Sequence, residues 1–195
     1  MKSEETLSQA RQQVLKVAGQ LFGERGYTAV TMRDIADALH MRQASLYYHA
    51  PGGKEQLFIE VTERSLKSHR QGLEQALESA EPAIQAQLQA AASWLLSQPP
   101  LDLTRLFRTD LPAISEQHSY RLTKVAYHAL LTPLERVITA AYERGEVRYA
   151  DPTLMAGSFL SVIESIHDMH RYTQTPKPVL AQDIIEVLLD GLRRR

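Results

Sequence analysis

Cysteine is absent from the 195-residue chain, so it can form no disulfide and offers no thiolate to a metal ion. Glycine is sparse at nine residues, and neither a G-x-G-x-x-G loop nor a Walker lysine loop occurs. No Ser-His-Asp order is flanked by the glycines of a nucleophile elbow. We therefore expect no enzyme, no catalytic residue and no cofactor.

Long apolar runs and a leader are also missing. The start of the chain, MKSEETLSQARQQ, is polar, unlike a secretory signal peptide. No apolar run approaches the roughly 18 residues that a membrane-spanning helix needs. Together with the lack of cysteine, these features predict a cytoplasmic protein that makes no membrane contact.

Charge of one sign does not dominate, because the formal net charge is only −1. This balance argues against a chain coated with basic residues for nucleic-acid binding. Residues 1–54 carry seven Lys or Arg and five Asp or Glu, a net charge of +2, and the rest of the chain carries −3. The asymmetry is small, but its sign is the one expected of a DNA-binding N-terminal region.

Apolar periodicity and helix-breaking residues predict an all-α fold with nine helices and no strands. Gly26 should end the first helix, and Pro133 should kink a long one. The expected helices cover residues 8–25, 31–39, 43–49, 54–80, 82–98, 101–110, 116–144, 152–172 and 179–193.

Residues 31–54, TMRDIADALHMRQASLYYHAPGGK, contain two short helices joined by a tight turn. That is the layout of a helix-turn-helix, whose second helix lies in the DNA major groove. Thr31 is suited to cap the first helix with its hydroxyl. The turn has His40 where such motifs usually have Gly, so we predict a positive φ at His40.

The second helix of this motif carries the candidate DNA contacts. Arg42, Gln43 and Ser45 lie at its N-terminal end, where such side chains can hydrogen-bond base edges. Tyr47, His49 and Lys54 are better placed for phosphate oxygens, which set the register without reading sequence. Ala44 is small, which favours close approach to the groove.

At this point the pattern resembles a known family. The segment GYTAVTMRDIADALHMRQASLYYHAPGGKEQLF resembles the N-terminal DNA-binding domain of the TetR family of bacterial transcription regulators. The resemblance implies a homodimer with a helix-turn-helix domain at residues 1–53 and a ligand-binding and dimerisation domain at residues 54–195. It also implies that the following residues face DNA: Thr31, Arg33, Gln43, Ala44, Ser45, Tyr47, Tyr48, His49 and Lys54.

Two features depart from the family pattern. His40 replaces the usual Gly, and the stretch from Ala50 to Gly53 is one residue longer than the common family loop before the Lys. These departures leave open a chain that has lost DNA binding and serves as an interaction scaffold. Tyr48 could also pack partly in the core instead of facing DNA.

The last two long helices have unusually apolar faces. The resemblance implies that they pair with their mates in a four-helix dimer interface, and the alternative is burial within their own domain. The expected interface residues are Phe159, Leu160, Ile163, Ile184, Val187 and Leu188.

Aromatic and histidine side chains of the C-terminal region could line an apolar effector pocket with a few polar groups. The alternative is ordinary core packing. The candidate pocket residues are Trp94, Phe107, Tyr120, Tyr127, His128, His167 and His170.

One cluster supports a different class of function. Glu164, His167, Asp168 and His170 fall close together on a helix and could hold Zn or Ni, with Asp110 or His118 completing the set. The chain would then be a metal sensor or a helical metal-dependent enzyme. The alternative is that these histidines are structural or contact an effector, with no metal bound.

The sequence therefore predicts a ligand-responsive homodimeric transcription regulator. In this interpretation it is a repressor that binds double-stranded DNA at a palindromic operator. A small-molecule effector of unknown identity would release it.

Overall fold

The structure is a computed structural model that describes residues 8–192, and those residues form helices and connecting turns only. They divide into two compact units. Among the described residues, the first unit contains residues 8–65 together with Asp102–Thr123, and the second contains Leu66–Leu101 together with residues 124–192. The predicted boundary after residue 53 does not coincide with this division.

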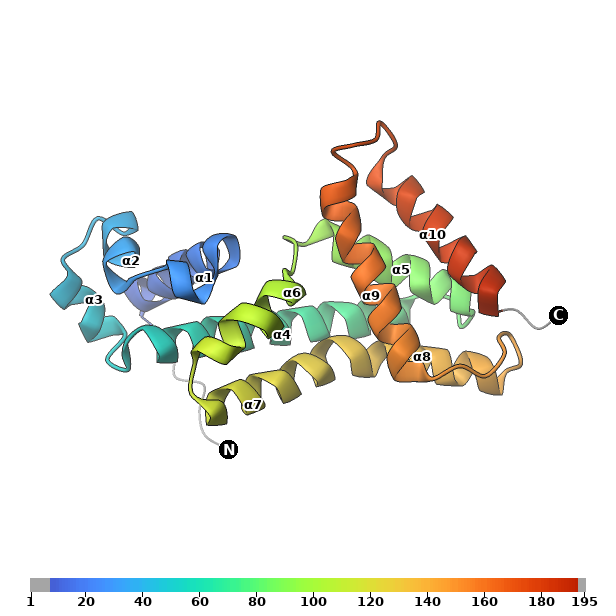
Figure 1. Cartoon of the computed structure of the whole chain (residues 1–195), viewed down its shortest axis with the longest axis horizontal. Coiled ribbons are helices and arrows are strands. Elements are labelled where there is room, and N and C mark those ends of the chain that lie inside the picture. The colour runs from blue at the N-terminus through green and yellow to red at the C-terminus, as the bar shows by residue number, and fades with distance from the viewer. Residues whose placement is uncertain (1–7, 193–195) are drawn as a thin grey trace. The chain divides into compact units, whose positions relative to one another are not determined.

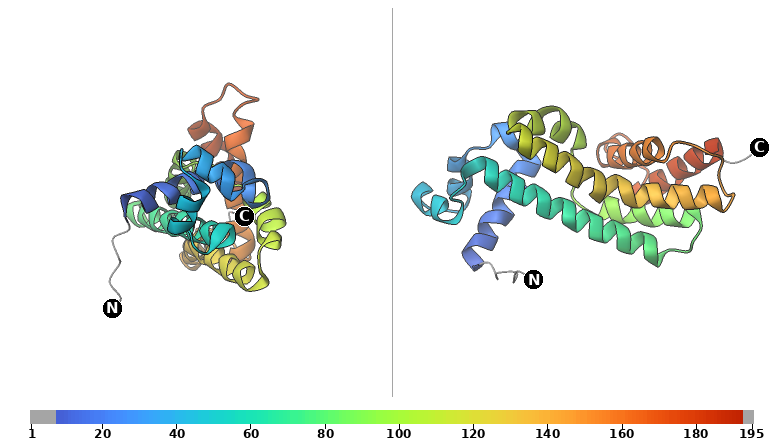
Figure 2. Two further views of the ribbon diagram at one scale, coloured as in Figure 1. Left: turned by 90° about the vertical axis from the view of Figure 1, so that its left-hand side faces the viewer. Right: turned by 90° about the horizontal axis from the view of Figure 1, so that it is seen from below.

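The first unit is built around the start of a long helix. α1 (Gln9–Ala29), α2 (Met32–Ala38) and α3 (Gln43–His49) gather about the first turns of α4 (Gly53–Ser79), as Figures 1 and 2 show. Leu57, Phe58 and Val61 of α4 are buried in the same core as Phe22 and Leu46. Residues beyond 53 therefore contribute to the core of the first unit.

The first unit also takes in a later segment of the chain. That segment comprises α6 (Leu103–Arg105), the π-helical turn η1 (Leu106–Asp110), the 3-10 turn η2 (Leu111–Ala113) and most of α7 (Glu116–Ala126). Leu111, Ile114 and Leu122 complete the core formed by α1–α4.

Two backbone breaks predicted from the sequence are confirmed in the first unit. Gly26 has φ 81° and ψ 169°, which interrupts the helical conformation of α1. His40 has φ 53° and lies directly after α2. The N–H of His40 donates to Asp37 O at 3.1 Å, and that of Met41 donates to Ala36 O at 3.0 Å. This is the hydrogen-bond pattern of a Schellman motif, with His in the position that usually holds Gly.

The second unit is a helical bundle. α9 (Pro152–Met169) packs against α5 (Ile84–Ser97), α8 (Thr132–Glu143) and α10 (Lys177–Leu192), and Figure 1 shows α9 beside α10. The end of α4 and the π-helical turn η3 (Tyr127–Leu131) belong to the same unit.

The predicted disturbance at Pro133 takes the form of a π-helical turn. The N–H of Thr132 donates to Tyr127 O, five residues back, instead of the usual four. Pro133 has no N–H to donate, and its ring would clash with the carbonyl four residues earlier in a regular α-helix. The helix therefore widens into a π-helical turn just before Pro133.

The predicted fold class is confirmed. Within residues 8–192, the α6–η2 segment and the α7–α8 segment each form one nearly continuous helix, which gives the nine helices predicted from the sequence. Residue 193, the predicted end of the last helix, lies outside the described range. Among the helices of residues 8–192, none combines the length and apolar character that crossing a bilayer requires.

Candidate nucleic-acid interface

The start of α2 is fixed by a reciprocal capping box. The Thr31 hydroxyl accepts from the N–H of Asp34 at 3.1 Å, and the N–H of Thr31 donates to the Asp34 carboxylate at 2.7 Å. Hydrogen bonds from the Thr31 side chain and then its backbone hold the pKa of Asp34 below its usual value. The capping role predicted for Thr31 is therefore confirmed, and α2 begins at a defined residue.

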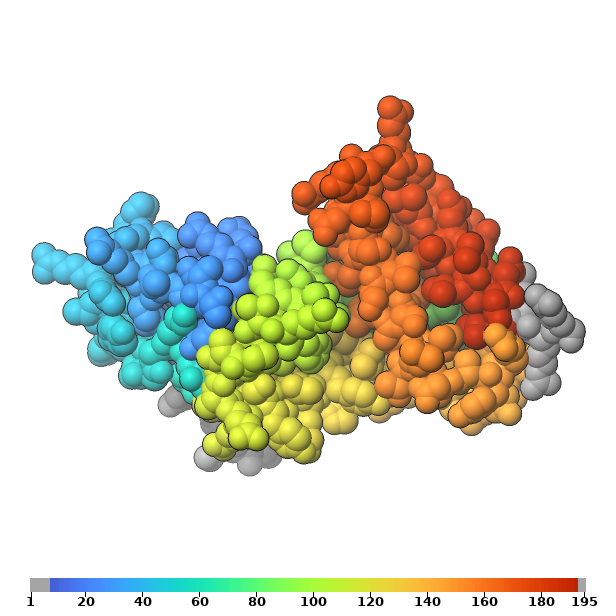
Figure 3. Space-filling model, in the orientation of Figure 1, coloured from blue at the N-terminus to red at the C-terminus, as the bar shows by residue number. Residues whose placement is uncertain are grey.

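α3, the second helix of the motif, buries a single residue of its seven. Leu46 is 0% exposed, whereas Arg42, Gln43, Ala44 and Ser45 are all exposed at the N-terminal end of the helix. Figure 3 shows the surface of α2 and α3, coloured light blue to cyan, open to solvent in that view. The side chains predicted to read bases thus share one accessible surface.

The C-terminal half of α3 carries the predicted phosphate contacts. Tyr47 is exposed and Tyr48 is 84% exposed, so the alternative that Tyr48 packs in the core is wrong. The two aromatic neighbours Tyr48 and His49 meet edge to face. His49 itself is half-buried, and Arg33 is exposed on α2.

The C-terminal end of α3 is held by an arginine of α1. The Arg11 guanidinium donates one hydrogen bond to the His49 carbonyl and a second to the Glu60 carboxylate of α4, at 2.6 Å. Glu60 also pairs with Arg64 at 3.2 Å. One half-buried side chain thus joins α1, α3 and α4.

Lys54 has a different position from the one the sequence suggested. Its ammonium donates to Tyr27 O at 2.8 Å and lies 4.0 Å from the centre of the Tyr27 ring. Partial burial lowers the pKa of Lys54, and the Asp110 charge opposes that shift. The Lys54 ammonium therefore contacts the backbone of its own unit, and this contact disfavours the predicted contact with a DNA phosphate.

Glu55, the next residue, joins α4 to the start of α7. It accepts hydrogen bonds from Ser115 Oγ at 2.7 Å and pairs with His118 Nδ1 at 2.7 Å. Hydrogen bonds from His118 and then Ser115 lower the pKa of Glu55. His118 is thus engaged within the first unit.

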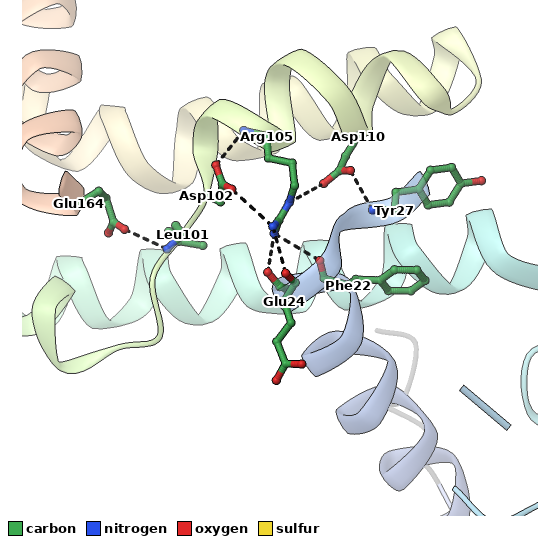
Figure 4. Close-up of polar contacts among 9 residues, drawn as sticks. Phe22, Glu24, Tyr27, Leu101, Asp102, Arg105, Asp110 and Glu164 are labelled. Atoms are coloured by element: carbon green, nitrogen blue, oxygen red, sulfur yellow. Dashed lines mark hydrogen bonds and ion pairs between the residues drawn. The ribbon is translucent and has the colours of Figure 1, made fainter. Parts of the chain in front are cut away.

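Arg105 and Asp110 bind polar backbone groups at the C-terminal end of α1 (Figure 4). The Arg105 guanidinium donates to the carbonyls of Gly23 and, at 3.4 Å, Phe22, which are among the last carbonyls before the break at Gly26. A cation at a helix C-terminus is favoured by the helix dipole and satisfies carbonyls that lack helical partners. The buried Asp110 carboxylate lies 3.6 Å from Arg105 Nε and accepts from the N–H of Tyr27 at 2.8 Å.

The candidate pocket residues are divided between the two units. Phe107 and Tyr120 belong to the first unit, whereas Trp94, Tyr127, His128, His167 and His170 belong to the second. Phe107, Tyr120, Tyr127 and His128 are exposed, because the two π-helical turns and the start of α7 turn these side chains outward. Trp94 instead packs edge to face on the buried His69.

The second unit does contain an apolar cavity, with a volume of about 20 Å³. That volume is close to what one water molecule requires, so an organic effector would have to open it. The side chains around it come from α5, α8, α9, α10 and the turn after α8, and they are Ile84, Leu88, Ile138, Val147, Met155, Phe159, Leu188, Leu189 and Leu192.

The metal interpretation is unsupported. Within residues 8–192, no three His, Asp or Glu side chains are grouped closely enough to hold an ion. Glu164 accepts from the N–H of Leu101 at 2.9 Å, and His170 Nδ1 contacts His167 O at 2.7 Å. Asp168 is exposed, and the proposed completing residues, Asp110 and His118, have their own partners in the first unit.

His167 is buried and paired with a cation. Lys177 Nζ lies 3.2 Å from His167 Nδ1, so Nδ1 is the acceptor and Nε2 carries the proton. Burial, followed by the charge of Lys177, lowers the pKa of His167. This histidine is therefore a neutral group within the second unit.

Three of the six predicted dimer-interface residues are buried in their own chain. Phe159, Leu160 and Ile163 face α5, α8 and α10 and are at most 3% exposed. Ile184 and Leu188 are half-buried, and Val187 is 67% exposed. α9 is apolar on more than one face, so its sequence alone could not distinguish the inward face.

A different face of α9 is open. Leu154 is 63% exposed and belongs to a shallow surface with Gly157, Ser158, Ser161 and Val162. Figure 3 shows the orange-to-red surface of α9 and α10 open in that view. This open face of α9 carries the small residues that allow close helix packing.

Sequence reasoning missed Arg11, Arg105 and Asp110 as residues that position the motif. Their contacts join positions that are 38 to 83 residues apart, so no local spacing signals them. An arginine near a helix end could have suggested Arg11 and Arg105, but such arginines are common, and no local signal points to Asp110.

The geometry defines a class of protein: a helix-turn-helix DNA-binding module with a helical second unit. Residues 14–61 match the model for bacterial regulatory proteins of the tetR family. Over 70 residues, 36% of this chain, the sequence is 37% identical to the HTH-type transcriptional regulator LmrA of Bacillus subtilis strain 168. The matched stretches span 24% to 45% of the lengths of the curated relatives.

Solved structures extend the likeness to nearly the whole chain. A TetR-family regulator, PfmR from Thermus thermophilus, is 25% identical, with a TM-score of 0.68 over 93% of this chain and 99% of that one. AibR, solved with isovaleryl coenzyme A and operator DNA, has a TM-score of 0.75 at 20% identity, over 92% of this chain and 97% of that one. Residues 14–61 thus resemble the tetR family of bacterial regulatory proteins, and the solved structures show the same fold over nearly the whole chain.

Proposed function

We propose that this protein is a dimeric transcription regulator, a repressor that a small molecule releases from a palindromic operator. The observation that carries the proposal is the surface of α3. Arg42, Gln43 and Ser45 are exposed together at its N-terminal end, while Leu46 fixes the opposite side in the core. Such side chains at that end of a helix match the donors and acceptors of base edges in the major groove.

Dimerisation is part of the proposal because a palindromic site requires two copies of α3, about 34–36 Å apart on DNA. The open face of α9, with Leu154 and the small residues Gly157, Ser158 and Ser161, supports a helix-to-helix contact. Val187 on α10 is also an exposed apolar residue. These residues replace Phe159, Leu160 and Ile163 as the proposed interface.

The effector in this proposal is a small molecule with an apolar part. The cavity of the second unit is enclosed by apolar side chains from several helices, and helices that enclose a cavity must move when a larger molecule enters. AibR, whose fold is similar, is solved in complex with isovaleryl coenzyme A and operator DNA. For this chain, the effector must bind the DNA-free and DNA-bound forms with different affinity.

The proposal assigns the chain no catalytic step, and the named relatives are regulators. It locates the protein in the cytoplasm, where its DNA target lies.

Selection of bound fragments from the source genome by the purified protein at moderate salt tests the proposal. We expect recovery of an inverted repeat, and genes next to that repeat would indicate the effector. Tyr47→Ala, run in parallel, should lose the enrichment, whereas Tyr172→Ala, at an exposed tyrosine of the second unit, should retain it.

No enrichment by the wild-type protein, in the absence and presence of cell extract and divalent metals, would contradict DNA reading. Enrichment that survives Tyr47→Ala unchanged would contradict the assignment of α3 as the DNA-contacting helix.

A further inference from the structure

The recognition helix α3 is short and has few contacts with the rest of its unit. Only Leu46 among its seven residues is buried, and Ala50 follows at its C-terminal cap. Leu46 and Ala50 hold the C-terminal half of α3 against the core, but these two apolar residues do not by themselves fix the tilt of the helix. A directional polar contact is needed in addition to define the direction in which Gln43 and Ser45 project.

The structure supplies that polar contact at the end of α3. The His49 carbonyl belongs to the last turn of the helix, where carbonyls lack helical donors. Its partner is the Arg11 guanidinium, which reaches it from α1. A cation at this end also interacts favourably with the helix dipole.

Arg11 is itself held in place. Its other terminal nitrogen donates to Glu60 of α4 at 2.6 Å, and both side chains are about three-quarters buried. The planar guanidinium can donate to two acceptors in fixed directions at once, which a lysine ammonium on its flexible chain does less well.

We infer that Arg11 is a positioning residue for DNA reading, because it fixes the tilt of α3 by joining the His49 carbonyl to Glu60. Arg11 acts through the helix and makes no base contact in this role. The inference rests on the proposed function, since it concerns how DNA is read.

Arg64 provides a matched control. It carries the same charge and pairs with the same carboxylate, Glu60, at 3.2 Å, and it is more exposed than Arg11. That ion pair lies within α4, the helix to which Arg64 itself belongs. Arg11→Met and Arg64→Met therefore each remove one positive charge and one ion pair to Glu60, but only Arg11→Met removes the contact with α3.

The first readout needs no DNA. Hydrogen exchange of the backbone amides of residues 46–50 is measured in the full-length wild type, Arg11→Met and Arg64→Met. We expect exchange about tenfold faster or more in Arg11→Met, from loss of a charged hydrogen bond, and wild-type rates in Arg64→Met. Equal exchange in all three proteins would overturn the inference.

The second readout compares the selected operator with a scrambled duplex of equal length. Arg11→Met should lower operator affinity by roughly 10- to 100-fold, yet lower affinity for the scrambled duplex no more than Arg64→Met does. Arg11→Lys keeps the charge and should restore the affinity for scrambled DNA but not the full preference for the operator. Equal losses in Arg11→Met and Arg64→Met, or wild-type preference in Arg11→Lys, would overturn the positioning role.

The two hypotheses fail in different ways. If the wild type prefers no DNA sequence, the proposed function fails and the DNA-reading role of Arg11 falls with it, whatever the exchange rates show. If the wild type reads its operator but Arg11→Met behaves as Arg64→Met, only the inference fails. If Arg11→Met does not fold, as judged by thermal melting, Arg11→Lys carries both readouts.

Discussion

The Asp110 carboxylate accepts a hydrogen bond from the backbone N–H of Tyr27 at 2.8 Å, across 83 positions of sequence. Tyr27 follows the break in α1, so its N–H has no helical partner, and Asp110 provides a buried acceptor. Arg105 balances the buried carboxylate at 3.6 Å and occupies the end of α1 beside it. Asp110 and Arg105 thus hold the C-terminal end of α1 against the segment that begins with α6.

Removing the charge of Asp110 should destabilise the first unit. Asp110→Asn retains an acceptor for Tyr27 but leaves Arg105 without its buried partner, at a cost of about 2 kcal/mol. Asp102→Asn removes an exposed partner of the same arginine and keeps a good helix cap, so it should cost at most about 0.5 kcal/mol. Urea unfolding measures both, and equal costs would contradict the special role of Asp110.

Gly26→Ala should lower the free energy of unfolding, unlike an alanine at a glycine of α1 that has helical backbone angles. A Cβ at Gly26 would lie 2.9 Å from both Arg105 Cδ and Asp110 Oδ1, and the φ of +81° is unfavourable for alanine. We expect a loss of about 2 kcal/mol or more in the free energy of unfolding. Gly23→Ala, three residues earlier, meets nothing within 4 Å and should stabilise by about 0.5–1 kcal/mol. Thermal melting that ranks the two variants in the reverse order would refute this account.

Local rules predicted the backbone of this chain better than its surfaces. The conformations at Gly26 and His40 follow from residue type and helix ends, and Pro133 disturbs its helix for a reason internal to that helix. The capping by Thr31 is equally local. These features were predictable because each depends on residues within about one helical turn.

Features that depend on distant partners were not predictable. Lys54 has the spacing of a phosphate ligand, but the Tyr27 carbonyl and ring, which another helix positions, direct it inward. The family resemblance implies a dimer surface that includes Phe159 and Ile163, but both side chains are buried in their own chain. Which side of α9 faces inward is decided by packing against α5, α8 and α10, and the single-chain pattern does not contain that information.

Glu164 should make the second unit's stability depend on pH. Burial raises the pKa of Glu164 to about 7, and the hydrogen bond from Leu101 only partly opposes this. Since its folded pKa exceeds the unfolded value, the protonated form favours folding. The associated stability is fully present below about pH 4.5 and is lost as pH rises through about 7.

Glu164→Gln should remove this dependence while keeping an acceptor for Leu101. Relative to wild type, the variant should gain stability between pH 5 and 8, by about 1–2 kcal/mol after allowance for partial exposure. Glu186→Gln, at an exposed position of α10, should leave the pH profile unchanged. Urea unfolding across this pH range decides the matter, and parallel curves for wild type and Glu164→Gln would show that the carboxyl is not buried in solution.

Gln43 and Tyr47 should affect DNA binding in different ways. Gln43→Ala should relax preference at particular base pairs of the operator, by about 1–3 kcal/mol each, because its amide can pair with a base edge. Tyr47→Ala should weaken binding to every sequence by a similar factor, since phosphate contacts carry no sequence information. Titration of single-base operator variants separates the two effects, and equal losses on cognate and scrambled DNA for Gln43→Ala would refute base reading.

The proposed dimer should depend on the exposed apolar residues of α9 and α10. Leu154 on α9 and Val187 on α10 are 63% and 67% exposed in the single chain, so a charge at either position should be tolerated by the folded monomer. In a dimer that buries these faces, an unpaired carboxylate would be desolvated, at a cost of several kcal/mol per subunit. Leu154→Glu and Val187→Glu should therefore yield monomers in analytical ultracentrifugation, with near-wild-type circular dichroism.

Phe107→Glu is the control for this experiment, because Phe107 is an exposed apolar residue of the first unit. It should remain dimeric at the same concentration. The monomeric variants should also lose affinity for the full inverted repeat, because they no longer hold two copies of α3 together. Each variant keeps an intact α3, so it should bind a half-site as the wild-type subunit does. If Leu154→Glu and Val187→Glu both remain dimeric, the subunits meet through a surface other than the open faces of α9 and α10.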